Sequence, residues 1–129
     1  MNMDTKCIDL RRELLRLKLE KFIMLGLRMD DIPNIRGQVV IYGAGTVGKL
    51  LLRCFEKKPD VFWDKRLCGQ EICSIPVYSV QEGVDRLSKN KDTTIIVTPV
   101  WDFEKICNEV EGDNPFVTVI SLEELLEKL

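Results

Sequence analysis

Apolar and polar residues follow two different periods along this chain. Over residues 5–27, apolar side chains recur every three or four positions between charged ones, which predicts an amphipathic helix with a wide apolar face. Further along, short apolar runs have the composition of buried strands. Residues 67–76 are expected to form a loop with one short extended piece, and Pro76 keeps the strand that follows short. The apolar runs occupy residues 38–42, 61–63, 77–78, 93–98 and 116–120.

The segments between these runs have helical spacing, and two of them begin with a capping box. The boxes are Ser79 with Glu82 and Ser121 with Glu124. Strands that alternate with helices form a parallel sheet that is covered on both faces. We therefore predict an α/β fold with a five-stranded parallel sheet in the order 3-2-1-4-5.

The predicted chain has two parts. Residues 37–129 form the three-layer domain, and residues 1–36 add the N-terminal amphipathic helix and a linker. This helix can pack across its own domain. Its apolar face also suits a contact with a second copy or a partner enzyme, through residues 5–27.

Three glycines follow the first predicted strand in the pattern G-x-G-x-x-G, and a helix from Thr46 to Lys57 follows them. Gly43 permits a tight turn, Gly45 lets a pyrophosphate approach the main chain, and Gly48 lets the helix pack closely on the strand. The free amides at the helix start then face the phosphate. Strand, glycine turn and helix in this order predict a Rossmann-like nucleotide-binding unit.

The loop after the second predicted strand begins with an acidic residue. Asp64 lies about 20 residues beyond the glycines, where such units place the acid that binds a ribose hydroxyl. The alternative for Asp64 is a solvated loop aspartate. Lys65 and Arg66 follow at once and can meet a ribose phosphate or remain solvated, so the choice between NAD and NADP stays open.

Ligands bind beyond the carboxyl ends of the strands in such a sheet. The loop after the fourth strand therefore belongs to the site, and Trp101 in it can stack on a base or serve as packing. Thr46 can meet a phosphate or simply cap its helix. The predicted cofactor-binding residues are Gly43, Ala44, Gly45, Thr46, Val47, Gly48, Asp64, Lys65, Arg66, Thr98 and Pro99.

The composition of the chain limits the classes of partner and the location that can be expected. The 129 residues carry a formal net charge of −2, which argues against nucleic acid as a partner. We expect no membrane insertion and a cytoplasmic location, because no run approaches the ~20 apolar residues of a membrane span and the start does not resemble a signal peptide. The five cysteines lack C-x-x-C spacing and the chain has no histidine, so we expect reduced, buried or partly buried thiols and no metal site.

Catalytic residues are not evident. Without histidine there is no Ser-His-Asp or Cys-His arrangement. Leu50 breaks the P-loop pattern that ends at Lys49, and neither tyrosine is followed four residues later by lysine. A binding module or a partial enzyme is therefore favoured over an autonomous catalyst.

Several segments together resemble a known group of domains. These are IYGAGTVGKLL, VFWDKR, GQEICSIPVYSVQE, TTIIVTP and VTVISLEELL. Over residues 38–129 the chain resembles the N-terminal Rossmann-like domain of nucleotide-sugar epimerase/dehydratases of bacterial polysaccharide biosynthesis. It is also similar to the N-terminal domain of sugar O-acyltransferases.

The resemblance implies a ligand and a pathway. The ligand would be NAD or NADP, or else CoA or a UDP-sugar, held by Gly43, Gly45, Thr46, Gly48 and Asp64. The pathway would be cell-surface polysaccharide or nucleotide-sugar metabolism. Neither the catalytic domain of the epimerases nor the left-handed β-helix of the acyltransferases is present, so no catalytic role is transferred. The alternatives are an oxidoreductase or nucleotide-sugar-modifying enzyme completed by a partner subunit, and an interaction domain that has lost its ligand.

Overall fold

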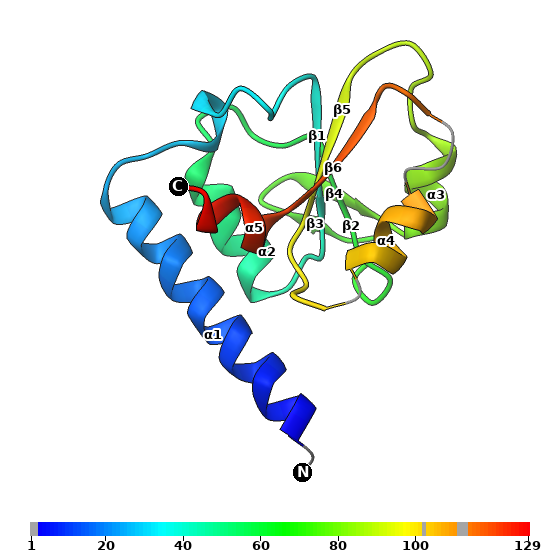
Figure 1. The fold of residues 1–129 in the computed structure, drawn as a ribbon. Coiled ribbons are helices and arrows are strands. Elements are labelled where there is room, and N and C mark those ends of the chain that lie inside the picture. Colours follow the sequence, from blue (N-terminus) through cyan, green and yellow to red (C-terminus); the bar gives the residue numbers. More distant parts are fainter. Residues whose placement is uncertain (1–2, 102, 111–113) are drawn as a thin grey trace.

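A six-stranded, mostly parallel sheet lies at the centre of the molecule, with the strands in the order β3-β4-β2-β1-β5-β6 (Figure 1). The computed structural model describes residues 3–101, 103–110 and 114–129. Only the pair β3–β4 is antiparallel. The strands are β1 (Gln38–Tyr42), β2 (Val61–Trp63), β3 (Glu71–Ile72), β4 (Ile75–Tyr78), β5 (Thr93–Val97) and β6 (Val117–Ser121).

The predicted count of five strands in the order 3-2-1-4-5 is wrong, because β3 adds an antiparallel strand at one edge. Residues 71–72, within the segment expected to be a loop with one short extended piece, form a paired strand that folds back on β4, with Ile72 opposite Ile75. The turn between them is formed by Cys73 and Ser74, both with positive φ, 51° and 69°. Two such residues form a tight hairpin turn, and Asn-Gly is its usual sequence signal. Cys-Ser lacks that signal, so the hairpin was not evident from the sequence.

Helices cover both faces of the sheet (Figure 1). The helices α1, α2 and α5 lie on one face, and α3 and α4 lie on the other. No helix in the described ranges combines the length and the apolar character needed to cross a membrane. The helices are α1 (Met3–Met24), α2 (Thr46–Leu51), α3 (Val80–Asp85), α4 (Phe103–Val110) and α5 (Leu122–Glu127), with short 3-10 helices η1 (Met29–Asp31) and η2 (Leu52–Cys54).

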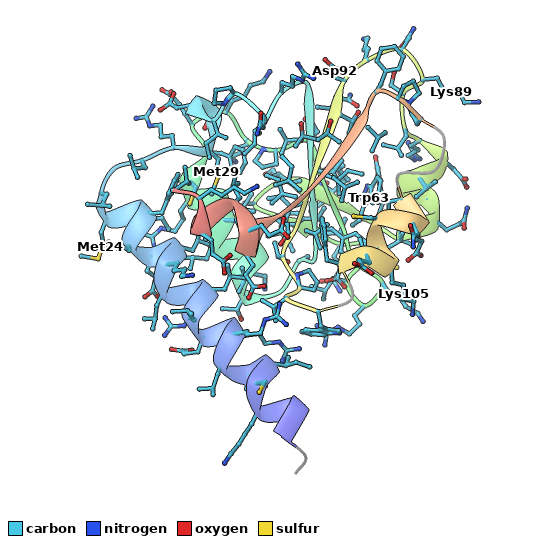
Figure 2. All side chains as sticks on the ribbon, viewed as in Figure 1. Met24, Met29, Trp63, Lys89, Asp92 and Lys105 are labelled. Atoms are coloured by element: carbon cyan, nitrogen blue, oxygen red, sulfur yellow. The ribbon has the colours of Figure 1, made fainter. Side chains whose placement is uncertain are left out.

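Alternating residues of the central strands supply the two layers of the core. Ile41 and Ile96 face the layer of α1, α2 and α5, and the intervening Val40 and Ile95 face α3 and α4. This two-residue period is what places one side chain of each pair on either face. Helix α1 contributes the buried side chains Leu15, Leu19 and Phe22 to the first layer. Figure 2 shows Met29 in the first layer and Trp63 on the opposite side, near α3 and α4.

The helix boundaries follow the capping chemistry. Ser79 Oγ accepts the N–H of Glu82 at 3.2 Å, and Ser121 Oγ accepts that of Glu124 at 3.3 Å, which confirms both predicted N-caps. The first helix ends at Met24 rather than at residue 27, where Gly26 turns the chain with a φ of 72°.

Helix α2 is shorter than the predicted span from Thr46 to Lys57. It ends at Leu51 and continues as the 3-10 turn η2. The amides of Glu56 and Lys57 then donate to the carboxylate of Asp30 instead of to helical carbonyls. This competing acceptor lies 26 residues away in sequence, so local helical spacing could not reveal it.

Candidate functional site

The carboxyl ends of the central strands are level with one another. In the register of the sheet Tyr42 pairs with Trp63 on one side and with Val97 on the other. The ladder continues into the loops, where Gly43 N–H donates to the carbonyl of Trp63 and Thr98 N–H donates to that of Tyr42. The glycine turn and the loops after β2 and β5 therefore start side by side at one edge of the sheet.

Two of the three motif glycines are required by the protein itself. Gly43 has a φ of 99°, and a Cβ there would lie 2.4 Å from Thr98 Oγ1. A Cβ at Gly48 would lie 2.0 Å from the carbonyl oxygen of Gly43. These contacts confirm the sequence-based roles of both residues: Gly43 makes the turn and Gly48 allows α2 to pack against it.

Gly45 differs from the other described glycines. A Cβ at this position would meet no atom within 4 Å, and its φ of −79° is open to any residue. Every other described glycine has either a positive φ or a steric contact that excludes a side chain. No steric contact and no positive φ among the described residues therefore requires glycine at position 45, and its missing side chain leaves open space beside the start of α2.

Asp64 is half-buried and binds backbone amides with both carboxylate oxygens. Its Oδ2 accepts the N–H of Ala44 at 2.8 Å. Its Oδ1 accepts the N–H groups of Arg66 at 2.8 Å and Leu67 at 3.2 Å. The side chain thus ties the glycine turn to the loop after β2, and it is not the solvated loop aspartate that was one alternative. Only Oδ2 retains a lone pair that can accept from a ligand hydroxyl, because Oδ1 already accepts two N–H groups.

Thr98 and Thr46 have simpler environments. Thr98 is buried, and its Oγ1 donates to the carbonyl of Tyr42 at 2.8 Å, so it joins the ends of β5 and β1. Thr46 is exposed at the first position of α2, and the N-cap is Gly45. The alternative role of Thr46 as the helix cap is therefore wrong, and its hydroxyl remains on the surface of the turn.

A cavity of about 650 Å³ lies over these strand ends. Nine of the eleven predicted residues line it, whereas Ala44 and Lys65 do not. Ala44 is fully buried beneath the turn, and Lys65 is exposed elsewhere in its loop. The predicted residues that line the cavity are Gly43, Gly45, Thr46, Val47, Gly48, Asp64, Arg66, Thr98 and Pro99.

Helix α1 forms a wall of this cavity that the sequence did not predict. Asp9, Arg12, Glu13, Leu15 and Arg16 line it from the helix side. The signal for their placement is absent from the local sequence, because charges on the polar face of an amphipathic helix are normally solvated. Only the packing of α1 beside α2 brings them to the strand ends.

Charged groups around the cavity differ in how far they are already paired. Arg16 binds both Glu13 and, at 2.6 Å, Glu20, and the hydrogen bond from Arg16 lowers the pKa of Glu13. Arg12 stacks over the ring of Trp101, with 4.1 Å between its Cζ and the ring centroid. Arg66 is exposed, and its guanidinium has no hydrogen bond or ion pair within the described ranges. Arg66 is thus the cavity's uncommitted cation, and one face of Trp101 is covered by Arg12.

Groups suited to catalysis or metal binding are sparse. No cluster of three or more Cys, Asp or Glu side chains that could hold a metal occurs among the residues the structure describes. Burial, followed by the nearby Glu109 and Asp64 carboxylates, raises the pKa of Tyr42, which disfavours its ionised form. Burial also raises the pKa of Cys54 to about 11, so this thiol stays protonated.

The expectation of buried or partly buried thiols holds for Cys54 but is wrong for three other cysteines. Cys7, Cys68 and Cys73 are exposed free thiols. Cys7 lies on the outer side of α1, and Cys73 lies in the tight turn between β3 and β4. Exposure at these positions follows from tertiary packing, which the cysteine spacing alone does not reveal.

No family model, curated protein or solved structure matches this chain. The likeness to domains of polysaccharide biosynthesis therefore remains a prediction from the residues that suggested it.

Proposed function

We propose that the chain is a Rossmann-like nucleotide-binding module acting in the cytoplasm, with the phosphates of its ligand beside Gly45. The observation on which this depends is the open space at Gly45. Gly43 and Gly48 are required by steric contacts in the fold, whereas Gly45, the N-cap of α2, has no such contact, and its missing side chain lets something outside the protein approach the main chain there. A phosphate at the start of a helix is the usual occupant of such a position.

The dimensions and charge of the cavity support this ligand class. A volume of about 650 Å³ lies within the usual range of small-molecule pockets, ~300–1,000 Å³. Arg66 offers an unpaired guanidinium that suits a phosphate. Asp64 offers the one remaining lone pair of Oδ2, on a fixed carboxylate, to a ribose hydroxyl.

The ligand is NAD or NADP, or a nucleotide-sugar, with CoA and UDP-sugars as the specific alternatives. A free cation and a fixed acid on the same loop suit both forms of the dinucleotide, so we retain both. The expected setting is cell-surface polysaccharide or nucleotide-sugar metabolism, on the basis of the sequence resemblance.

The alternative of an interaction domain that has lost its ligand is supported by a separate observation. Both oxygens of Asp64 bind backbone amides, so this residue has an architectural role even without a ligand. The same holds for Gly43, Gly48 and Thr98. An interaction domain that kept the fold and lost its ligand would retain these residues, and it would have no need of glycine at position 45.

Thermal denaturation in the presence of NAD, NADP, CoA or a UDP-sugar tests the proposal. A ligand at 100 times its Kd raises the apparent stability by about 2.7 kcal/mol, which is readily seen as a higher Tm. If none of the four classes of ligand raises the Tm, the interaction-domain alternative is preferred.

Two variants locate the site. Gly45→Val fills the open space and should abolish the ligand-induced shift, while leaving the protein folded. Lys49→Val places the same side chain on an exposed position of α2 that does not line the cavity, and should keep the shift. A shift that persists in Gly45→Val places the ligand elsewhere. Turnover of a nucleotide-sugar by the purified chain would instead favour the alternative of a nucleotide-sugar-modifying enzyme.

A further inference from the structure

Helix α1 has two apolar faces, and the domain covers only one of them. Leu15, Leu19 and Phe22 are buried against the first core layer. A second set of side chains lies exposed along the helix, with Leu10 at 69%, Leu14 at 52% and Leu17 at 49% exposure. We call this set the outer seam; it consists of Cys7, Leu10, Leu14, Leu17, Lys21 and Met24.

The spacing within the outer seam alternates strictly between three and four residues. This is the heptad pattern of a coiled coil, in which Cys7, Leu14 and Lys21 take the a positions and Leu10, Leu17 and Met24 the d positions. Figure 2 shows the side chain of Met24 directed away from the rest of the molecule. The outer seam therefore has the pattern of one helix of a two-helix coiled coil.

The length of α1 supports the same conclusion. Its 22 residues span ~33 Å, whereas the other described α-helices have six to eight residues. The N-terminal half of α1 extends beyond the sheet (Figure 1). Arg11 and Arg12 hold this half through Glu123 and Trp101. Half of the 22-residue helix is shorter than the ~12–15 residues below which an isolated helix is marginal in water, so a second helix on the outer seam would stabilise this extended half.

We propose that the outer seam binds a second copy of this chain, with the two α1 helices parallel. The orientation follows from the charges that flank the seam. The e positions hold the basic Arg11 and Lys18, and two of the g positions hold the acidic Glu13 and Glu20. A parallel pair brings g against e of the partner, so Glu13, which Arg16 already binds on its own helix, also meets the partner's Lys18, twice in the symmetric dimer. Such e–g pairs determine helix orientation.

An antiparallel pair is disfavoured by the same charges. It brings e against e and g against g, which in the fully overlapping register places Arg11 against the partner's Lys18 and Glu13 against the partner's Glu20. Both contacts are between like charges. Opposite signs at e and g are complementary only in the parallel arrangement.

The parallel dimer has two unfavourable contacts, and both are moderated. Lys6 faces the partner's Arg11, but Arg11 already donates hydrogen bonds to the carboxylate of Glu123, and these bonds raise the pKa of Arg11. Lys21 faces the partner's Lys21 at an a position. A single polar a residue reduces stability but specifies the oligomeric state, and its long side chain can extend to solvent.

Cross-linking through Cys7 tests the orientation. In the parallel dimer Cys7 faces the partner's Cys7, whereas an antiparallel pair places it near the partner's Met24. A short bismaleimide added to the full chain should therefore give a covalent dimer on a denaturing gel, and Cys7→Ser should remove it while Cys68→Ser and Cys73→Ser do not. A dimer in solution without the Cys7 cross-link would overturn the parallel arrangement.

Sedimentation tests the seam itself and needs no nucleotide, so its outcome is independent of the proposed ligand site. The wild type should sediment with twice the 14.9 kDa mass of one chain. Leu14→Glu with Leu17→Glu should weaken the dimer by about tenfold or more, because two exposed leucines would lose their partners. Leu129→Glu, at an equally exposed leucine outside the seam, is the matched control. A monomeric wild type, or a dimer unaffected by the double substitution, contradicts the proposal.

Discussion

The backbone N–H of Ala44 donates to Asp64 Oδ2 at 2.8 Å, and this bond joins the glycine turn after β1 to the loop after β2. Ala44 is completely buried, so its N–H has no access to water as an alternative acceptor. The same carboxylate holds the amides of Arg66 and Leu67 through its other oxygen. The residue that the sequence assigns to ribose binding is therefore also the residue that shapes the site.

Asp64→Asn should destabilise the protein in the absence of any nucleotide. An asparagine keeps one oxygen acceptor but turns an NH₂ group toward a backbone amide, which leaves a donor without a partner. The expected loss is about 1–3 kcal/mol in the free energy of unfolding, measured by urea denaturation. Asp31→Asn makes the same change at an exposed aspartate and should have little effect. Equal stability of the two variants would mean that the Ala44–Asp64 bond contributes nothing.

Alanine at Gly48 and at Gly45 should give opposite results. A Cβ at position 48 would lie 2.0 Å from the Gly43 carbonyl oxygen, so α2 must move away from the turn. We expect Gly48→Ala to cost about 1–3 kcal/mol or more. A Cβ at position 45 meets open space, and Gly45→Ala should remain within about 1 kcal/mol of the wild type. Urea denaturation of both variants makes the comparison, and similar losses would remove the distinction between a packing glycine and a ligand-facing one.

The contrast between these glycines shows what the sequence can and cannot predict about the site. The motif places three glycines, and the fold explains two of them through contacts between Gly48, Gly43 and Thr98. The contact between Gly48 and Gly43 follows from strand, turn and helix in sequence order, so a local pattern is sufficient to predict it, whereas Thr98 comes from the distant loop after β5. Asp64 was also found from its position after a strand.

Other parts of the site depend on packing between distant segments. The position of Arg12 over Trp101 joins residues 89 positions apart, and no local pattern indicates it. The β3–β4 hairpin was missed for a different reason, since Cys73 and Ser74 adopt positive φ without the glycine or asparagine that usually marks such a turn. Local chemistry thus predicts the parallel strands and the glycine turn. Tertiary contacts determine the α1 wall of the cavity and the antiparallel edge strand β3.

Arg12→Gln should expose Trp101 and slightly destabilise the protein. The guanidinium lies 4.1 Å from the ring centroid, and such a contact at an exposed site contributes about 0.5–1 kcal/mol. Acrylamide quenching of fluorescence should increase, and Trp63 contributes little to the change because it is 1% exposed. Arg28→Gln removes a charge that pairs with Glu56 and touches no tryptophan, so it should leave quenching unchanged. Unchanged quenching in Arg12→Gln would show that the stacked contact is not maintained in solution.

The pH dependence of stability should reveal Asp30, whose carboxylate accepts the N–H groups of Glu56 at 2.8 Å and Lys57 at 3.1 Å. Burial alone would raise the pKa of Asp30, but these amides together outweigh it and the pKa is lowered. A lowered pKa means that the folded state favours the ionised form. The contribution of Asp30 to the free energy of unfolding is therefore complete above the unfolded pKa of ~4 and disappears as the pH falls through the lower native value.

Asp30→Asn should therefore cost about 1 kcal/mol at pH 7, less than a buried charged hydrogen bond because the side chain is exposed. In urea denaturation at pH 7 and at pH 2, the difference from wild type should shrink at the lower pH, whereas the difference for Asp31→Asn should not. A difference for Asp30→Asn that is the same at both pH values would contradict the assignment of this pH dependence to the Asp30 carboxylate.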